Sequence, residues 1–411
     1  MKKRLANWRR PPIKNNEAAL KHSGGISGQE ANMLTVVPVT NKAELKQFIK
    51  FPYDLYKDEP NWIAPLRFER MTQINPAKNP ALVGVESQLF LALQNGKVVG
   101  RIAAIKNPHH LDTHNDGAGH FGYFDCQPDI RIGAALMRAA ENWLQERGLS
   151  KIVGPYQYTI YEEVGLLVDG FDTPPVIMMP YGRADYPKML EDMGFTKAVD
   201  MIAYWADMHA GYPRPKIVET MLANIESDPD ISVRPMRKGK FLEEVQLAME
   251  IFNDAWADNW GHVSLSDAQI THMANELKPV ISQDFFWVCE YKGEPAAFIL
   301  MVPNVNEAIR DLDGKLLPFG WAKLLYRLKI KGVKSARIPL MGVRREFQRK
   351  RTGLSMAAFL SEKVFEMGRK HGYTHVEMGW ILESNKSMIR IIEQALGVPY
   401  KTYRMYEKPI S

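Results

Sequence analysis

The sequence predicts an α/β protein with two similar domains, each a mixed, mostly antiparallel sheet flanked by helices. Three observations support this. Its 411 residues exceed the length of one ordinary domain. Short apolar runs bounded by turn residues, typical of strands, alternate with longer segments whose apolar residues recur at helical spacing. The order strand, helix, hairpin, strand, helix, strand, helix, strand occurs twice, which indicates an internal duplication.

The first half, residues 34–210, begins with a strand at 34–39 and an amphipathic helix at 43–56. A hairpin is predicted at 89–105, because the dipeptide Asn95-Gly96 favours a type I′ turn. The most regular helix spans 130–147 and ends before Gly148, since glycine is common just after a helix. The other predicted elements are strands at 120–126, 151–154 and 200–207 and a helix at 186–193.

The second half, residues 231–411, repeats this order. Lys292-Gly293 forms the turn of a second hairpin, at 285–302. The other predicted elements are strands at 231–236, 337–343 and 375–381, helices at 241–256, 353–371 and 385–396, and a final alternating strand. Gly211, Pro213 and Pro215 mark a linker at 211–230.

The composition restricts the class of protein. With 45% hydrophobic and 24% charged residues the chain can bury a full core, and no apolar run approaches the roughly 18 residues of a membrane span. The two cysteines, Cys126 and Cys289, form neither a disulfide framework nor a metal cluster, which predicts a reducing, cytoplasmic environment. The histidines of 109–120 lack further ligands, so we expect solvated loop side chains and no metal.

The net charge of +6 is concentrated at the N-terminus. Residues 1–33 carry seven Lys or Arg against two Glu, a balance of +5. The segment lacks a hydrophobic core region, so it is not a signal peptide and is expected to be a flexible basic arm. Translation that begins at Met33 is the alternative.

Residues 337–360 combine an apolar strand, a basic turn and a helix that opens near Gly353. The first backbone N–H groups of a helix have no partner within the helix, and its macrodipole favours an anion there. The turn is therefore a natural phosphate site. The alternative is an ordinary exposed loop.

This segment resembles the acyl-CoA-binding strand–turn–helix of the GNAT superfamily of N-acetyltransferases. The motif reads roughly Val-x-x-x-(Arg/Gln)-x-x-Gly-x-(Gly/Ala), and Val343, Lys350 and Gly353 match it, while Ser355 stands where Gly or Ala is usual. The resemblance implies a tandem GNAT fold and acetyl-CoA or a longer acyl-CoA as co-substrate. The residues that it assigns to the cofactor are Met341, Val343, Lys350, Arg351, Gly353, Ser355 and Asn385, the last of which also suits a helix N-cap.

The two halves differ at this motif. The matching segment of the first half, residues 125–136, has no basic turn, and Asp125 and Asp129 would repel a phosphate. The resemblance therefore assigns the cofactor to the second domain and makes the first a degenerate copy.

Residues 154–180 carry the acidic pair Glu162-Glu163 among tyrosines. Paired acids beside aromatic rings can raise the pKa of one carboxyl group, which suits a base that takes a proton from an amine. The alternative is a solvated acidic loop. From Met33 onward the chain also resembles a group of bacterial GNAT-related proteins of largely unassigned role, some of whose relatives are similar to lipid-amine N-acyltransferases.

The resemblance implies attack of an amine on an acyl-CoA thioester. Candidates for the base are Glu162, Glu163, Glu377 and Glu383, and candidates for the acid that protonates the thiolate are Tyr400 and Tyr403. We therefore predict an acyl-CoA-dependent N-acyltransferase whose preferred acceptor is a long-chain lipid amine. The alternative is a non-catalytic GNAT-fold protein that binds a ligand or lipid.

Residues 316–334 place apolar residues on one helical face and basic residues on another. Such a helix suits peripheral contact with the anionic inner face of a membrane, or a cover over an acyl chain. The alternative is a helix packed on the sheet. No nucleic-acid recognition motif accompanies the charge, so nucleic acid is not an expected partner.

Overall fold

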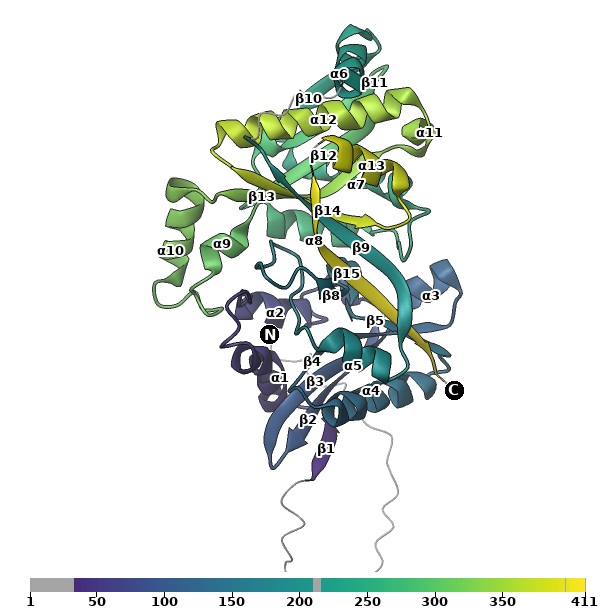
Figure 1. Cartoon of the computed structure of the whole chain (residues 1–411), viewed down its shortest axis with the longest axis vertical. Coiled ribbons are helices and arrows are strands. Elements are labelled where there is room, and N and C mark those ends of the chain that lie inside the picture. The colour runs from purple at the N-terminus through teal and green to yellow at the C-terminus, as the bar shows by residue number, and fades with distance from the viewer. Residues whose placement is uncertain (1–32, 210–215, 396, 411) are drawn as a thin grey trace, which may run out of the picture. The chain divides into compact units, whose positions relative to one another are not determined.

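The computed structural model describes residues 33–209, 216–395 and 397–410 (Figure 1). Residues from Leu34 onward form one compact unit whose alternating strands and helices confirm the predicted α/β class. The predicted arm at 1–33 lies, except for Met33, outside the described residues. Part of the predicted linker, 216–227, forms a helix that packs on the second half. The domain boundaries themselves stay predictions.

The first half contains the elements of one mixed sheet, its helices and a small hairpin. In chain order they are β1 (Leu34–Pro38), α1 (Lys42–Leu55), α2 (Arg67–Gln73), β2 (Glu86–Gln94), β3 (Lys97–Lys106), α3 (Pro108–His114), β4 (Ala118–Cys126), α4 (Ile130–Gln145), β5 (Lys151–Gly154), β6 (Tyr156–Gln157), β7 (Thr159–Val164), β8 (Leu166–Asp169), α5 (Tyr186–Asp192) and β9 (Thr196–Asp207).

The second half repeats the plan with longer helices. Its elements are α6 (Lys216–Ser227), β10 (Ile231–Pro235), α7 (Phe241–Trp256), α8 (Asp267–Leu277), β11 (Phe286–Tyr291), β12 (Glu294–Pro303), α9 (Val305–Ile309), α10 (Gly320–Tyr326), η4 (Arg327–Lys331), β13 (Ser335–Val343), α11 (Arg345–Gln348), α12 (Arg351–Lys370), β14 (His375–Leu382), α13 (Lys386–Ala395) and β15 (Val398–Pro409).

Thirteen strands of the described residues join in one sheet. Twelve follow the order β1-β2-β3-β4-β5-β15-β9-β14-β13-β12-β11-β10, and β8 pairs with β15 beside this path. Neighbours run antiparallel except for the pairs β4–β5 and β13–β14, which are parallel. The two parallel pairs occupy equivalent places in the two halves, as a duplication requires.

The final strands of the two halves are exchanged. β9, which ends the first half, pairs with β14 of the second, whereas β15, which ends the second, pairs with β5 of the first. The two exchanged strands also pair with each other along most of their length, and they run side by side through the middle of Figure 1. The halves therefore share one continuous sheet.

Helices cover both faces of the second half's sheet. On one face α12 packs against β11, β12 and β13, and on the other α7 packs against β12, β13 and α8. The local turns follow the sequence: Asn95 and Gly96 both have positive φ, as do Lys292 and Gly293, which matches type I′ turns.

The prediction for 316–334 needs correction. Helix α10 covers only Gly320–Tyr326 and continues as the π-helical turn η4. Leu324 and Leu328 pack against the core, but Trp321 and Leu325 are each 51% exposed. The expected single apolar face is thus divided between the core and the surface.

Candidate active site

A wedge opens in the sheet of the second half between β13 and β14. The two strands pair only from Ser335–His375 to Ile338–Met378. Beyond this point β13 stays with β12 up to Val343, while β14 stays with β9. One edge of residues 339–343 therefore has no strand partner, although Nε1 of Trp256 donates to the carbonyl oxygen of Met341 and Nε2 of Gln348 donates to that of Val343.

The basic turn lies directly after the wedge strand. Helix α12 begins at Arg351 with Lys350 in the N-cap position, and no side chain caps its first N–H groups. Lys350 and Arg351 are exposed. A Cβ at Gly353 would lie 2.2 Å from the carbonyl oxygen of Phe347, so glycine allows the turn to approach the helix closely. Uncapped N–H groups beside two cations are suited to a phosphate.

The equivalent place in the first half is closed. Asp129 caps α4 with its own carboxylate, which accepts from the N–H of Arg131 at 2.9 Å. A Cβ at Gly122 on β4 would lie 1.6 Å from the carbonyl oxygen of Tyr156, so the chain itself packs against β4 in the first wedge. The two halves therefore differ at this motif, as the sequence predicts; the assignment of the cofactor to the second half stays a prediction.

A cleft opens beside the wedge on the face covered by α7 and α8. Two of its lining residues are charged: Glu162, from β7 of the first half, and Arg337, from β13. The cleft therefore combines both halves of the chain. The lining residues are Ile160, Tyr161, Glu162, Met178, Met249, Phe252, Trp256, Leu265, Met273, Leu277, Arg337, Pro339, Leu340 and Trp380.

Glu162 is partly buried and is a chemically poised group in the cleft. Its Oε2 accepts a hydrogen bond from Nε2 of Gln73 at 2.9 Å. Burial raises the pKa of Glu162 to about 7, while Arg70 and the bond from Gln73 act in the opposite direction. A carboxyl group with this pKa is half ionised at neutral pH and can accept a proton from an amine.

Glu163 has a different environment from its neighbour. Arg70 forms an ion pair with Glu163, and Nε2 of Gln157 donates to it at 2.9 Å. It does not line the cleft. Its position suits the support of Arg70 rather than proton transfer, and its predicted catalytic role stays a prediction.

A buried polar cluster lies where β13 and β14 still pair, and it includes a tyrosine from β15. Nε of Arg337 is 3.1 Å from Oε1 of Glu377, an ion pair without hydrogen-bond geometry, and Tyr400 donates to the other oxygen of Glu377. Arg337 also donates to the carbonyl oxygens of Ile177 at 2.8 Å and Gly379 at 3.0 Å. Glu377 is fully buried and engaged by two side chains, so it is a structural group rather than a free base.

The two candidate acids differ in their partners. The hydroxyl of Tyr400 is bound to Glu377, and burial raises its pKa. Tyr403 is fully buried, and its hydroxyl has no hydrogen-bond partner within the described part of the chain. Burial, followed by the charge of Glu377, also raises the pKa of Tyr403. Both tyrosines therefore keep their protons at neutral pH.

Like Tyr400 and Tyr403, the remaining predicted residues lie outside the cleft. Glu383 is bound by Lys197 at 3.0 Å and by the backbone N–H of Asp200 at 3.1 Å. Asn385 caps α13 by accepting from the N–H of Met388 at 3.2 Å. Ser355 is buried inside α12. Their catalytic and cofactor roles stay predictions.

Sequence reasoning missed part of the site. Arg337 is an isolated cation in an apolar strand, a signal that was present in the sequence but was not used. Gln73 and Arg70 come from α2, a segment without a clear pattern. Trp256, whose Nε1 donates to the carbonyl oxygen of Met341 at 3.1 Å, was read only as part of a helix.

The histidine prediction was wrong about exposure. His110 on α3 and His120 on β4 are both buried, because their rings pack on each other with centroids 4.5 Å apart. Within the residues that the structure describes, no group of three or more His, Cys, Asp or Glu side chains is placed to hold a metal ion.

None of the helices in the described part of the chain is long and apolar enough to cross a membrane.

The chain is similar to two known proteins over most of its length. It is 44% identical over 378 residues to the bacterial ceramide synthase of Caulobacter vibrioides (strain NA1000 / CB15N), covering 92% of this chain and 98% of that protein. It is 42% identical over 373 residues to Protein YghO of Escherichia coli (strain K12), covering 90% and 94%. No protein-family model matches the chain.

A solved structure shows the fold independently. The chain superposes on a tandem GNAT protein from the clavulanic acid biosynthesis pathway with a TM-score of 0.53 at 12% identity, covering 92% of this chain and 99% of that one. At this identity the likeness concerns the fold alone, and it confirms the predicted tandem GNAT architecture.

Proposed function

This chain belongs to the family of GNAT-fold proteins that includes the bacterial ceramide synthase of Caulobacter vibrioides and Protein YghO, and on that premise we propose that it is an acyl-CoA-dependent N-acyltransferase. The observation that carries the proposal is the position of Glu162. This carboxyl group, with a pKa of about 7, lines a cleft beside an open wedge that ends in an uncapped, basic helix N-terminus.

The donor lies along the wedge in this proposal. The phosphates of acyl-CoA bind the first N–H groups of α12 with Lys350 and Arg351 as counter-charges. The extended arm follows the free edge of residues 339–343, where an N–H group polarises the thioester carbonyl. The acyl group then reaches the cleft on the α7 and α8 face.

The reaction needs no covalent enzyme intermediate. The amine nitrogen attacks the thioester carbon, a C–N bond forms and the C–S bond breaks. Glu162 accepts the proton that the amine loses, and the leaving thiolate takes a proton from a tyrosine. Neither candidate tyrosine lines the cleft; we propose Tyr403 for this second role, because its hydroxyl has no partner among the described residues, whereas that of Tyr400 is bound to Glu377.

A long-chain lipid amine is the proposed acceptor. One relative is named a ceramide synthase, and a ceramide is an amide of such an amine. The cleft also suits an apolar substrate, since twelve of its fourteen lining residues are uncharged and Met, Phe, Trp, Leu, Ile, Pro or Tyr.

We also propose that the reaction takes place at the cytoplasmic face of a membrane. Of the thirteen large hydrophobic side chains that are exposed in the described residues, six lie between 317 and 330. Leu317, Phe319 and Ile330 are 81%, 77% and 75% exposed. Residues 315–334 contain six Lys or Arg and no acid, although Lys315, Lys323 and Arg327 form ion pairs with Asp311 or Asp313 just before them. Exposed apolar side chains among cations match the chemistry of an anionic lipid surface.

The test is transfer from palmitoyl-CoA to a sphingoid amine by the purified protein, with acetyl-CoA and a small polar amine as alternatives. We expect amide formation and its loss in Lys350→Glu with Arg351→Glu, because reversed charges repel the phosphates. The matched control is Lys363→Glu with Lys370→Glu, at the far end of the same helix. If the protein binds acyl-CoA but converts no amine, the non-catalytic alternative is favoured. If it binds no acyl-CoA, both the proposed acyl-CoA site and the proposed reaction are refuted.

A further inference from the structure

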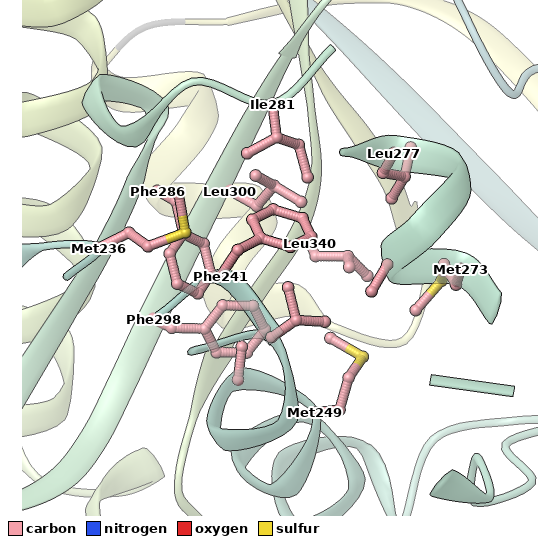
Figure 2. A pocket seen from close by; sticks show the side chains of 13 residues that line it. Met236, Phe241, Met249, Met273, Leu277, Ile281, Phe286, Phe298, Leu300 and Leu340 are labelled. Carbon is pink, nitrogen blue, oxygen red and sulfur yellow. The ribbon is translucent and has the colours of Figure 1, made fainter. Parts of the chain in front are cut away.

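A second cavity, here called the apolar chamber, lies between α7, α8 and the strands β11 to β13 (Figure 2). All thirteen residues that line it are apolar, among them Phe241, Met249, Ala274, Leu277, Phe298 and Leu340. In Figure 2 the side chains of Met273 and Leu277 on α8 face those of Phe241, Phe286 and Phe298 across the chamber. It offers no hydrogen bond to a polar ligand.

The chamber adjoins the cleft and shares part of its wall. Met249, Met273, Leu277 and Leu340 line both of them. Leu340 lies on β13 at the wedge, next to the strand edge along which the donor is proposed to run. Leu340 therefore lies between the proposed thioester position and the apolar chamber.

The border of the chamber distinguishes it from an ordinary packing defect. The space for the centres of water-sized molecules is only about 20 Å³, room for one or two water molecules, but it is bordered by three methionines, Met236, Met249 and Met273. Methionine side chains are unbranched and rotate readily, so they can withdraw to admit a hydrocarbon chain and refill the space when it leaves.

We propose that the apolar chamber binds the hydrocarbon chain of the acyl donor and makes the enzyme selective for long acyl groups. The inference rests on the proposed function. The polar end of the cleft, at Glu162, is where the amine nitrogen must lie, whereas a chain bonded to the thioester carbonyl leaves the wedge at Leu340. The hydrocarbon chain of the acyl donor, rather than that of the amine, is therefore aligned with the chamber.

The expected selectivity follows from hydrophobic transfer. Each additional methylene that the chamber buries tightens donor binding about fourfold, so octanoyl-CoA and palmitoyl-CoA bind progressively better than acetyl-CoA. The gain in affinity with acyl chain length ends when the chain fills the chamber.

The experiment narrows the junction between cleft and chamber with Met273→Trp. Met273 is partly buried on α8, so an indole is accommodated at the expense of the chamber. The matched control is Met367→Trp, a partly buried helix methionine on the opposite face of the sheet. Leu277→Trp provides a second variant at the same junction. The measurements are the Kd of acetyl-, octanoyl- and palmitoyl-CoA without amine, and kcat/KM for each donor with short and long amines.

In Met273→Trp we expect the preference for palmitoyl-CoA over acetyl-CoA, measured as the ratio of their Kd values and of their kcat/KM values, to fall about tenfold or more. Met367→Trp should keep the wild-type profile. An unchanged donor profile in both junction variants would overturn the inference, as would a change in amine preference alone, since the chamber would then hold the acceptor. If the wild type bound donors but transferred no acyl group, the proposed function would fail while the Kd values still tested the chamber.

Discussion

Replacing Glu162 by Gln tests the proposed base most directly. The variant keeps the shape of the side chain and an oxygen that accepts the hydrogen bond from Gln73, but it removes the group that takes up the proton. We expect kcat to fall about a hundredfold or more, which is typical for the loss of a general base. The Kd of acyl-CoA should not change, because the proposed phosphate contacts lie at the other end of the wedge.

The raised pKa predicts how the rate of the wild type depends on pH. With a pKa of about 7, the ionised fraction of Glu162 rises from about a tenth at pH 6 to about nine tenths at pH 8. Gln73→Leu removes a hydrogen bond to the ionised form, a contribution of about 1.5 kcal/mol or more and hence about one pKa unit. The ionised fraction at pH 7 then falls about fivefold, and the difference disappears near pH 9.

The assay is the pH profile of kcat/KM for amide formation. The amine substrate also titrates, but its contribution cancels in the ratio of variant to wild type at each pH. Gln157→Leu is the matched control, because Gln157 donates to Glu163 and not to Glu162. Its profile should have the wild-type midpoint.

Stability provides an independent check of the same pKa. The pKa of Glu162 in the folded protein lies above its ordinary value of 4.5, so the folded state binds more protons between pH 4.5 and about 7. Its contribution to the free energy of unfolding is therefore fully present below pH 4.5 and is lost as the pH rises through 7. At pH 8 Glu162→Gln removes an unfavourable buried charge and should raise the free energy of unfolding by up to about 3 kcal/mol.

Two results would refute this reasoning. One is a Gln73→Leu variant whose rate midpoint coincides with that of the wild type. The other is a folded Glu162→Gln variant that retains more than about a tenth of the wild-type kcat.

The remaining predictions concern the membrane surface and the closed wedge of the first half. Leu317→Ser with Phe319→Ser should weaken binding to anionic vesicles about tenfold or more in sedimentation, with kcat on a micellar substrate unchanged; undiminished vesicle binding would exclude this surface. Gly122→Ala should lower the free energy of unfolding in urea by about 2 kcal/mol or more, because its Cβ would lie 1.6 Å from the carbonyl oxygen of Tyr156. The control Gly148→Ala, with nothing within 4 Å, should cost only about 1 kcal/mol, so equal losses would contradict the close approach.

The sequence by itself determined the local elements and the position of the proposed donor site. The turns at Asn95-Gly96 and Lys292-Gly293, and the helix before Gly148, depend on residues close together in the chain. The basic turn at Lys350 and Arg351 is likewise a local pattern, because an anion site at a helix start needs only that start and its neighbours. The asymmetry between the halves was visible for the same reason.

Only the tertiary structure decided which of the candidate carboxylates lines the cleft. Glu162 belongs to the first half but lines a cleft of the second, because the exchange of β9 and β15 holds the two halves in one sheet. Glu383 was a candidate base but is bound by Lys197, a residue far away in sequence. Strand exchange and ion pairing depend on contacts between distant segments, and these contacts cannot be predicted from the residues next to each position in the chain.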